Sequence, residues 1–172
     1  VLWLLFLVGD ADSGNAKIRE VIDRAYGVDF FAGDEDNGEM GAWFVLAALG
    51  LFSVAPGSED YVLGCPLFDR VTIRDVPGRE PLDIYSHRSD RSVTGVAETW
   101  YADAHGAETR LESPTIRYSA LKAGGAIHAF GAGTPRDPEA PLVKPREPEA
   151  PAAESRDAFW AKLEKEHAAD HP

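Results

Sequence analysis

Residues 32–43 read Ala32-Gly33-Asp34-Glu35-Asp36-Asn37-Gly38-Glu39-Met40-Gly41-Ala42-Trp43, and an apolar run follows them as far as Leu49. The run from Glu39 to Leu49 predicts a helix that ends at Gly50, a residue that readily takes the left-handed conformation of a helix end. Because this helix is apolar on nearly all sides, it is expected to be buried. Three acidic residues precede it, where first-turn amide groups favour anions.

The charge of the chain is strongly and unevenly acidic. The formal net charge is −12, and residues 1–60 hold eleven Asp and Glu but only three Lys and Arg. No Lys or Arg occurs between Arg24 and Arg70. This balance argues against a nucleic-acid partner or an anionic membrane surface, which basic patches bind. Distant residues, helix amides or a metal ion must therefore compensate any carboxylates held against apolar groups.

Asp34 and Asp36 are the candidate catalytic residues of this stretch. Two neighbouring carboxylates push their pKa values apart, and one that stays ionised can deprotonate a water molecule. The flanking glycines Gly33 and Gly38 allow a ligand to approach the backbone closely. The residues alone leave an acidic helix cap as the alternative. An EF-hand does not fit, because Phe44 would occupy its twelfth position, where a carboxylate ligand is required.

The first third of the chain, residues 1–60, predicts helices. Residues 1–8 are apolar, are far shorter than a membrane span and lack the flanks of a signal peptide. We interpret them as the end of a buried helix whose upstream half is missing. A second helix is expected from Ser13, as its N-cap, to Gly27, with apolar residues at helical spacing such as Ile18 and Ile22.

The middle of the chain, residues 61–133, predicts a small antiparallel β unit. Short runs rich in β-branched and aromatic residues alternate with Pro, Gly and Asp turns. The expected strands are Tyr61–Leu63, Phe68–Ile73, Leu82–Tyr85, Thr99–Ala102 and Ala126–Phe130. The single cysteine, Cys65, excludes an internal disulfide and a cysteine-based zinc site.

The last part of the chain, residues 134–172, predicts a tail. Six of the twelve prolines fall in residues 134–155, within repeated Pro-Glu-Ala phrases. Proline removes backbone donors and interrupts helices and strands, so this stretch is expected to be a disordered linker. Phe159, Trp160 and Leu163 are spaced to form one apolar stripe of a short final helix.

The acidic stretch and the residues after it resemble glycoside hydrolase family 92, the calcium-dependent inverting exo-α-mannosidases. The residues that carry the resemblance are the Gly33–Gly38 core with Met40, Ala42 and Trp43, then Pro56-Gly57-Ser58, Tyr61-Val62-Leu63-Gly64 and Pro66-Leu67-Phe68. The resemblance covers about residues 1–131. Two positions differ from the usual pattern: Glu39 stands where Gln is usual, and Gly41 where Ser or Ala is commoner.

This resemblance implies an α+β chain. Its residues 1–60 would be the last helices of an (α/α)6 catalytic barrel, followed by the small antiparallel β extension and the Pro-rich tail. Asp34 and Asp36 would position and deprotonate the attacking water, while Glu35, Asn37 and Glu39 would contact the substrate. The resemblance also implies a Ca²⁺ cofactor, whose main ligands would lie upstream of this chain together with the general acid.

The implied substrate is a terminal α-mannoside, such as the α-1,2-mannose of an oligosaccharide or a glycoprotein glycan. The implied partner is the remainder of the parent enzyme, without which this segment would be inactive. The implied location is extracellular or periplasmic. An alternative from another class is a non-catalytic, β-rich carbohydrate-binding or interaction module, in which the acidic loop only caps a helix.

Overall fold

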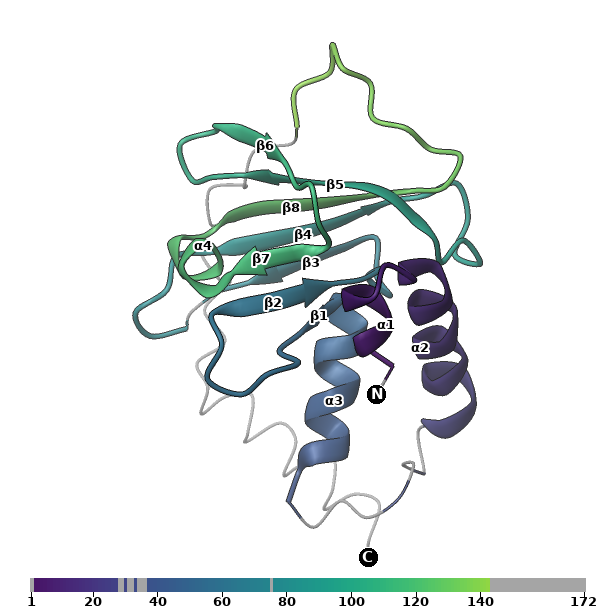
Figure 1. Ribbon diagram of the computed structural model, residues 1–172. Helices are drawn as coiled ribbons and strands as arrows, with labels where there is room; N and C mark the ends of the chain where they lie inside the picture. The colour runs from purple at the N-terminus through teal and green to yellow at the C-terminus, as the bar shows by residue number, and fades with distance from the viewer. Residues whose placement is uncertain (1, 28–29, 31–32, 34–36, 75, 143–172) are drawn as a thin grey trace, which may run out of the picture.

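The computed structural model shows an α+β arrangement, with three helices on one side of two stacked sheets (Figure 1). It describes residues 2–27, 30, 33, 37–74 and 76–142. The helices are α1 (Leu4–Leu7), α2 (Ala11–Ala25) and α3 (Glu39–Leu49). None of the helices within these ranges is long and apolar enough to cross a bilayer.

Helix α2 begins two residues before the predicted N-cap. Asp10 is the N-cap, and its carboxylate accepts a hydrogen bond from the backbone N–H of Ser13 at 3.3 Å. The prediction of Ser13 as the cap is therefore wrong, because Asp10 offers the same acceptor chemistry one turn earlier. The apolar face of α2, with Ile18 and Ile22, packs against Trp3 and Phe6 around α1.

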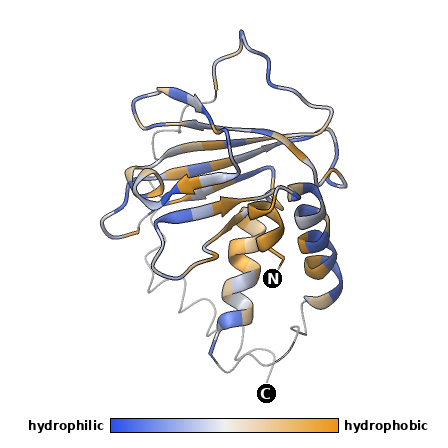
Figure 2. Cartoon of the chain, viewed as in Figure 1, coloured by the Kyte–Doolittle hydropathy of each residue, from blue (hydrophilic) through white to orange (hydrophobic). Residues whose placement is uncertain are grey.

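Helix α3 has the predicted bounds, but it is less buried than expected. Of its residues only Ala47 and Ala48 are buried, and the side chain of Val45 is 56% exposed. The prediction of full burial is not met among the described residues, because only one side of α3 packs against them, although most of the helix after its acidic start is apolar (Figure 2). Gly50 ends the helix at φ +70°, and a Cβ there would lie 2.8 Å from the carbonyl oxygen of Gly64.

The smaller sheet begins directly after α3. It has the order β1-β2-β7, all antiparallel. Its strands are β1 (Leu51–Phe52), β2 (Asp60–Leu63) and β7 (Thr115–Arg117). The larger sheet has the order β3-β4-β8-β5-β6. Its strands are β3 (Arg70–Ile73), β4 (Leu82–His87), β5 (Val96–Ala102), β6 (Glu108–Arg110) and β8 (Gly125–Gly131).

The larger sheet is mixed rather than antiparallel. Strands β4 and β8 run parallel, with Leu82 opposite Gly125 and His87 opposite Phe130, while the other pairs are antiparallel. The antiparallel prediction is wrong for this central pair, because the short helix α4 (Tyr118–Ala123) returns the chain to the starting end of β4. The main core lies between the two sheets and includes Leu51, Leu63, Leu82, Ile84, Ile116, Leu121 and Ile127.

Residues 134–142 pack against β5 and β6, so the prediction of disorder is wrong for them. The guanidinium of Arg136 lies 3.9 Å from the ring centroid of Trp100 and forms an ion pair with Glu108. The backbone N–H of Leu142 donates to the Glu108 carboxylate at 3.0 Å, and the Leu142 side chain is buried. The rest of the predicted tail, residues 143–172, lies outside the described residues, as does its predicted short helix.

Candidate active site at the start of α3

The structure describes only part of the predicted catalytic loop. Asn37 and Glu39 are described, and both are exposed beside the first turn of α3. Asp34, Glu35 and Asp36 lie outside the described residues. Their assigned roles as catalytic and substrate-binding residues therefore stay predictions, and the following paragraphs concern the frame that carries the loop.

The backbone on both sides of the loop is held by short-range contacts. Before the loop, the N–H of Gly27 donates to the carbonyl of Phe30 at 3.0 Å, and the Phe30 ring lies directly against Gly27. After the loop, Gly38 adopts φ +72° as the N-cap of α3 and accepts a hydrogen bond from the N–H of Ala42 at 3.0 Å. Gly38 fits this left-handed position at little steric cost.

Tyr26 joins the end of α2 to the start of α3. Its hydroxyl donates to the carbonyl oxygen of Met40 at 3.1 Å. Its ring stacks on Trp43 and contacts Phe44, with centroid distances of 5.7 and 5.1 Å. The described residues on either side of the acidic stretch therefore belong to two elements that are fixed to each other.

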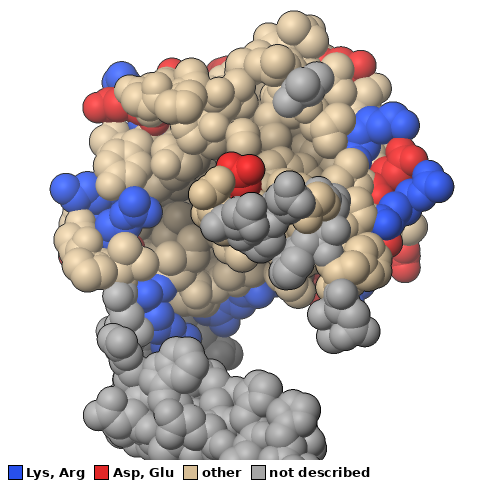
Figure 3. All heavy atoms as spheres, turned by 90° about the horizontal axis from the view of Figure 1, so that it is seen from below, with Lys and Arg blue, Asp and Glu red and all other residues tan. Residues whose placement is uncertain are grey.

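The first turn of α3 stabilises acidic side chains. Glu39 lies in the first turn of α3, where the helix dipole and the first N–H groups stabilise negative charge. Gly38 has no side chain that could occupy those N–H groups as a cap. Viewed from below, Lys and Arg side chains gather mainly toward the sides of this face (Figure 3).

The donor chemistry of the described part of the loop suits a hard cation, but the ligand number does not. Asn37 and Glu39 offer amide and carboxylate oxygens, which Ca²⁺ prefers. Across the ranges that the structure describes, no group of three or more His, Cys, Asp or Glu side chains could hold a metal ion. A calcium site at this loop would need further ligands from residues that are not described or from another part of the enzyme.

Sequence reasoning missed a histidine pair in the larger sheet. His87 on β4 and His128 on β8 are 41 positions apart, yet their ring nitrogens Nε2 and Nδ1 lie 2.9 Å from each other. His87 also stacks on Phe130 with a centroid distance of 4.4 Å, and burial lowers the pKa of His87. The pair depends on the parallel register of β4 and β8, which no local sequence signal indicates.

Comparison with known proteins places the chain in a family. The sequence profile described as the Glycosyl hydrolase family 92 catalytic domain matches residues 1–129. The chain belongs to glycosyl hydrolase family 92. The match includes α1, α2, α3 and the complete loop between α2 and α3, so the predicted resemblance is confirmed. A search of curated proteins finds no match.

Solved structures of family 92 members share the fold. An α-mannosidase from Bacteroides thetaiotaomicron aligns over 81% of this chain and 20% of its own, with a TM-score of 0.67 and 21% identity. The same mannosidase in complex with mannoimidazole aligns over 99% of this chain and 22% of its own, with a TM-score of 0.68 and 23% identity.

A second enzyme from that organism, an inverting mannosidase, aligns over 76% of this chain and 17% of its own, with a TM-score of 0.64 and 25% identity. This chain therefore spans about a fifth of the length of the solved family 92 structures that it resembles.

Proposed function

We propose that this chain is a segment of the catalytic domain of an inverting α-mannosidase that removes terminal α-mannosyl residues from glycans. The observation that carries the proposal is the position of the acidic loop. It lies within the matched residues 1–129, and the elements on either side of it are joined by the hydrogen bond from Tyr26, the C-cap of α2, to Met40 on α3.

The chemistry assigned to the loop is that of a general base. An inverting glycosidase needs a carboxylate that activates water on the face of the sugar opposite the leaving group, about 6.5–9.5 Å from the general acid. Asp34 and Asp36 would share this task, one accepting the proton and the other holding the water. Glu35, Asn37 and Glu39 would contact sugar hydroxyls, which the exposure of Asn37 and Glu39 allows.

A calcium ion is part of the proposal, with most of its ligands outside this chain. When bound, Ca²⁺ would supply positive charge beside the sugar hydroxyls and the attacking water. The acidic loop and its few neighbouring bases suit such an ion, since no Lys or Arg lies between Arg24 and Arg70 in the sequence. An extracellular or periplasmic location stays a prediction of the family resemblance.

The helices α1, α2 and α3 are proposed to be the last helices of an (α/α)6 barrel. Apolar side chains that are exposed on this segment support the proposal, because a complete domain seldom leaves so many in one layer. They include Leu4, Leu7 and Val8 around α1 and Val45 on α3. The remainder of the parent enzyme would cover them.

The decisive experiment replaces Asp34 and Asp36 separately with Asn in the enzyme that contains this segment. Asn keeps the size of the side chain but cannot accept the proton, so kcat on an α-mannoside should fall by roughly 10²–10⁴ while KM changes little. Asp23→Asn on the exposed side of α2 is the matched control and should retain parental kcat. Near-parental kcat in both loop variants would show that the loop only caps a helix. The non-catalytic carbohydrate-binding or interaction module would then describe the chain better.

A further inference from the structure

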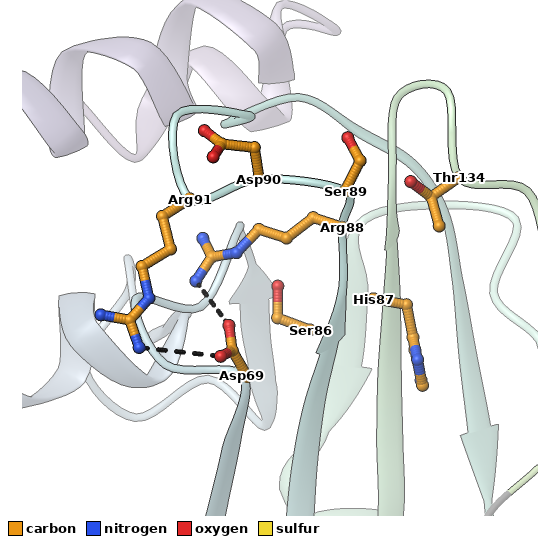
Figure 4. Close-up of a pocket in the computed structure, with 8 residues that line it drawn as sticks. All are labelled: Asp69, Ser86, His87, Arg88, Ser89, Asp90, Arg91 and Thr134. Atoms are coloured by element: carbon orange, nitrogen blue, oxygen red, sulfur yellow. Dashed lines mark hydrogen bonds and ion pairs between the residues drawn. The ribbon is translucent and has the colours of Figure 1, made fainter.

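A polar pocket of about 530 Å³ opens at the end of β4. In the ribbon view this end of the sheet lies near the start of α2, whereas the start of α3 lies at the far end of the helix layer (Figure 1). The side chains that shape the pocket include Asp69, Ser86, Arg88, Ser89, Asp90 and Thr134 (Figure 4). They come from three segments that are distant in sequence.

Arg88 is the fixed element of this pocket. Its side chain is only 2% exposed, and its two terminal nitrogens donate to the carbonyls of Pro66 at 3.1 Å and Leu67 at 2.7 Å. The same guanidinium forms an ion pair with Asp69 at 3.4 Å, and Arg91 approaches the other Asp69 oxygen at 3.7 Å. A buried guanidinium with so many partners holds one geometry, as a binding site requires.

The loops around Arg88 are also held by hydrogen bonds. Hydrogen bonds from the Ser92 side chain and from the Ser92 N–H, the latter at 2.7 Å, lower the pKa of Asp90 and keep that carboxylate ionised. The N–H of Thr134 donates to the carbonyl of Gly131 at 3.0 Å, and the N–H of Ser86 donates to the carbonyl of Asp69 at 2.9 Å. All three walls of the pocket are therefore preorganised.

Two polar atoms at the pocket lack partners. Among the described residues, Arg88 Nε and Thr134 Oγ1 are buried and make no hydrogen bond. A buried polar atom without a partner costs free energy, which a ligand with donors and acceptors can recover.

The charges of the pocket distinguish between possible ligands. Arg88 and Arg91 are balanced by Asp69 and Asp90, so the pocket has no net charge with which to attract an anion. The carboxylates, guanidinium groups and hydroxyls that line the pocket instead match neighbouring hydroxyls of a sugar, each of which both donates and accepts. The volume suits a small ligand. The His87 side chain points away from the other pocket side chains, so it offers no aromatic platform (Figure 4).

We propose that this pocket is a second, non-catalytic binding site for a neutral sugar, formed by Asp69, Arg88, Asp90 and Thr134. The site is separate from the acidic loop at α3, and the inference stands whether or not that loop is catalytic. Without stacking on an aromatic ring, the affinity for one sugar unit is weak. In a glycan hydrolase such a site would hold a branch of the substrate other than the one being cleaved.

The test is a nuclear magnetic resonance titration of the 172-residue chain, labelled with ¹⁵N. Methyl α-D-mannoside is expected to shift the amide resonances of residues 86–91 and 134 in a saturable manner. Inorganic phosphate at equal ionic strength is the second probe and is expected to leave them in place. Absence of saturable shifts with the mannoside, or saturation by phosphate alone, would overturn the proposal. Shifts confined to Asn37 and Glu39 would assign sugar binding to the acidic loop alone and would also overturn it.

Variants separate the pocket from general effects on the fold. Asp69→Asn should weaken mannoside binding at the pocket by about tenfold, because it removes a charged acceptor. Thr134→Val keeps the shape of the side chain, loses its hydroxyl and should weaken binding by about threefold. Thr109→Val, at an exposed position on β6, is the matched control and should bind as the parent does. Parental affinity in both pocket variants would show that the sugar is held elsewhere.

Discussion

The helical part and the β part of the chain bury their apolar side chains to different extents. Strand β8 is buried along its whole length, and β4 is buried at five of its six positions. Helix α3 is more apolar than either strand, yet only two of its eleven residues are buried. The apolar side chains of the β part pack against one another, whereas the helical part exposes apolar surface that a larger enzyme would cover. Stability and activity are therefore expected to depend on different halves.

The largest expected effect comes from the core between the two sheets. Ile84 is 1% exposed and packs among residues of both sheets. Ile84→Ala should lower the free energy of unfolding by about 2–5 kcal/mol, because the strands around the cavity cannot close it. Val45→Ala on α3 is the matched control and should change that free energy by less than about 0.5 kcal/mol. Urea unfolding followed by circular dichroism measures both, and equal losses would remove the contrast between the two halves.

The segment 134–142 offers a second comparison within the β part. Leu142 is 7% exposed and packs with Tyr85, Ala102, Ala126 and Phe130. Leu142→Ala should therefore cost about 2 kcal/mol of unfolding free energy. Glu139→Ala, at an exposed position of the same segment, should be close to neutral. If both variants unfold at the parental urea concentration, the packing of this segment adds nothing to the free energy of unfolding.

The sequence predicted those parts of the fold that local signals define. The bounds of α3 follow from an apolar run between Gly38 and Gly50. Both glycines, one before the helix and one after it, adopt the left-handed conformation. The parallel pairing of β4 with β8 depends on the path of the chain through α4, and the packing of residues 134–142 depends on Glu108 and Trp100. Such long-range contacts leave no periodic pattern in the segments that make them.

The candidate site and the pocket likewise combine features that a local motif predicts with features that only long-range contacts create. The motif around Gly33–Gly38 identified the family, which the profile match confirms, because it is a continuous stretch of chain. The hydroxyl of Tyr26 donates to the carbonyl of Met40 on α3. Nothing in the sequence indicated this contact, apart from the position of Tyr26 near a helix end. The polar pocket at Arg88 joins Asp69, the end of β4 and Thr134, so no single stretch of sequence could have predicted it.

A smaller effect is expected at the start of α2, in the helical part. Asp10→Ala removes the carboxylate that accepts from the Ser13 N–H and should cost about 1 kcal/mol. Ser13→Ala is the control, because its hydroxyl does not cap the helix, and it should cost much less. Thermal unfolding of the two variants measures the difference. A larger loss in Ser13→Ala would restore Ser13 as the cap.

The smallest expected effect concerns the pH dependence of the β part, through the pair His87 and His128. Burial lowers the pKa of His87 in the folded chain below its ordinary value of 6.5. Well above pH 6.5 the imidazole is neutral in both the folded and the unfolded chain, so its contribution to stability is complete. As the pH falls below that value, the unfolded chain binds the proton first, and the free energy of unfolding decreases until the lowered pKa is passed.

The change that tests this is His87→Gln, which keeps a polar side chain but cannot take up a proton. The decrease in stability between pH 7 and pH 5.5 should be smaller in this variant than in the parent, since one linked proton is lost. His105→Gln, in an exposed turn, is the matched control and should retain the parental slope. Urea midpoints at several pH values provide the measurement. Parallel curves for the parent and His87→Gln would mean that the proton is taken up equally by the folded and the unfolded chain, and that the burial of His87 beside Phe130 does not limit its ionisation.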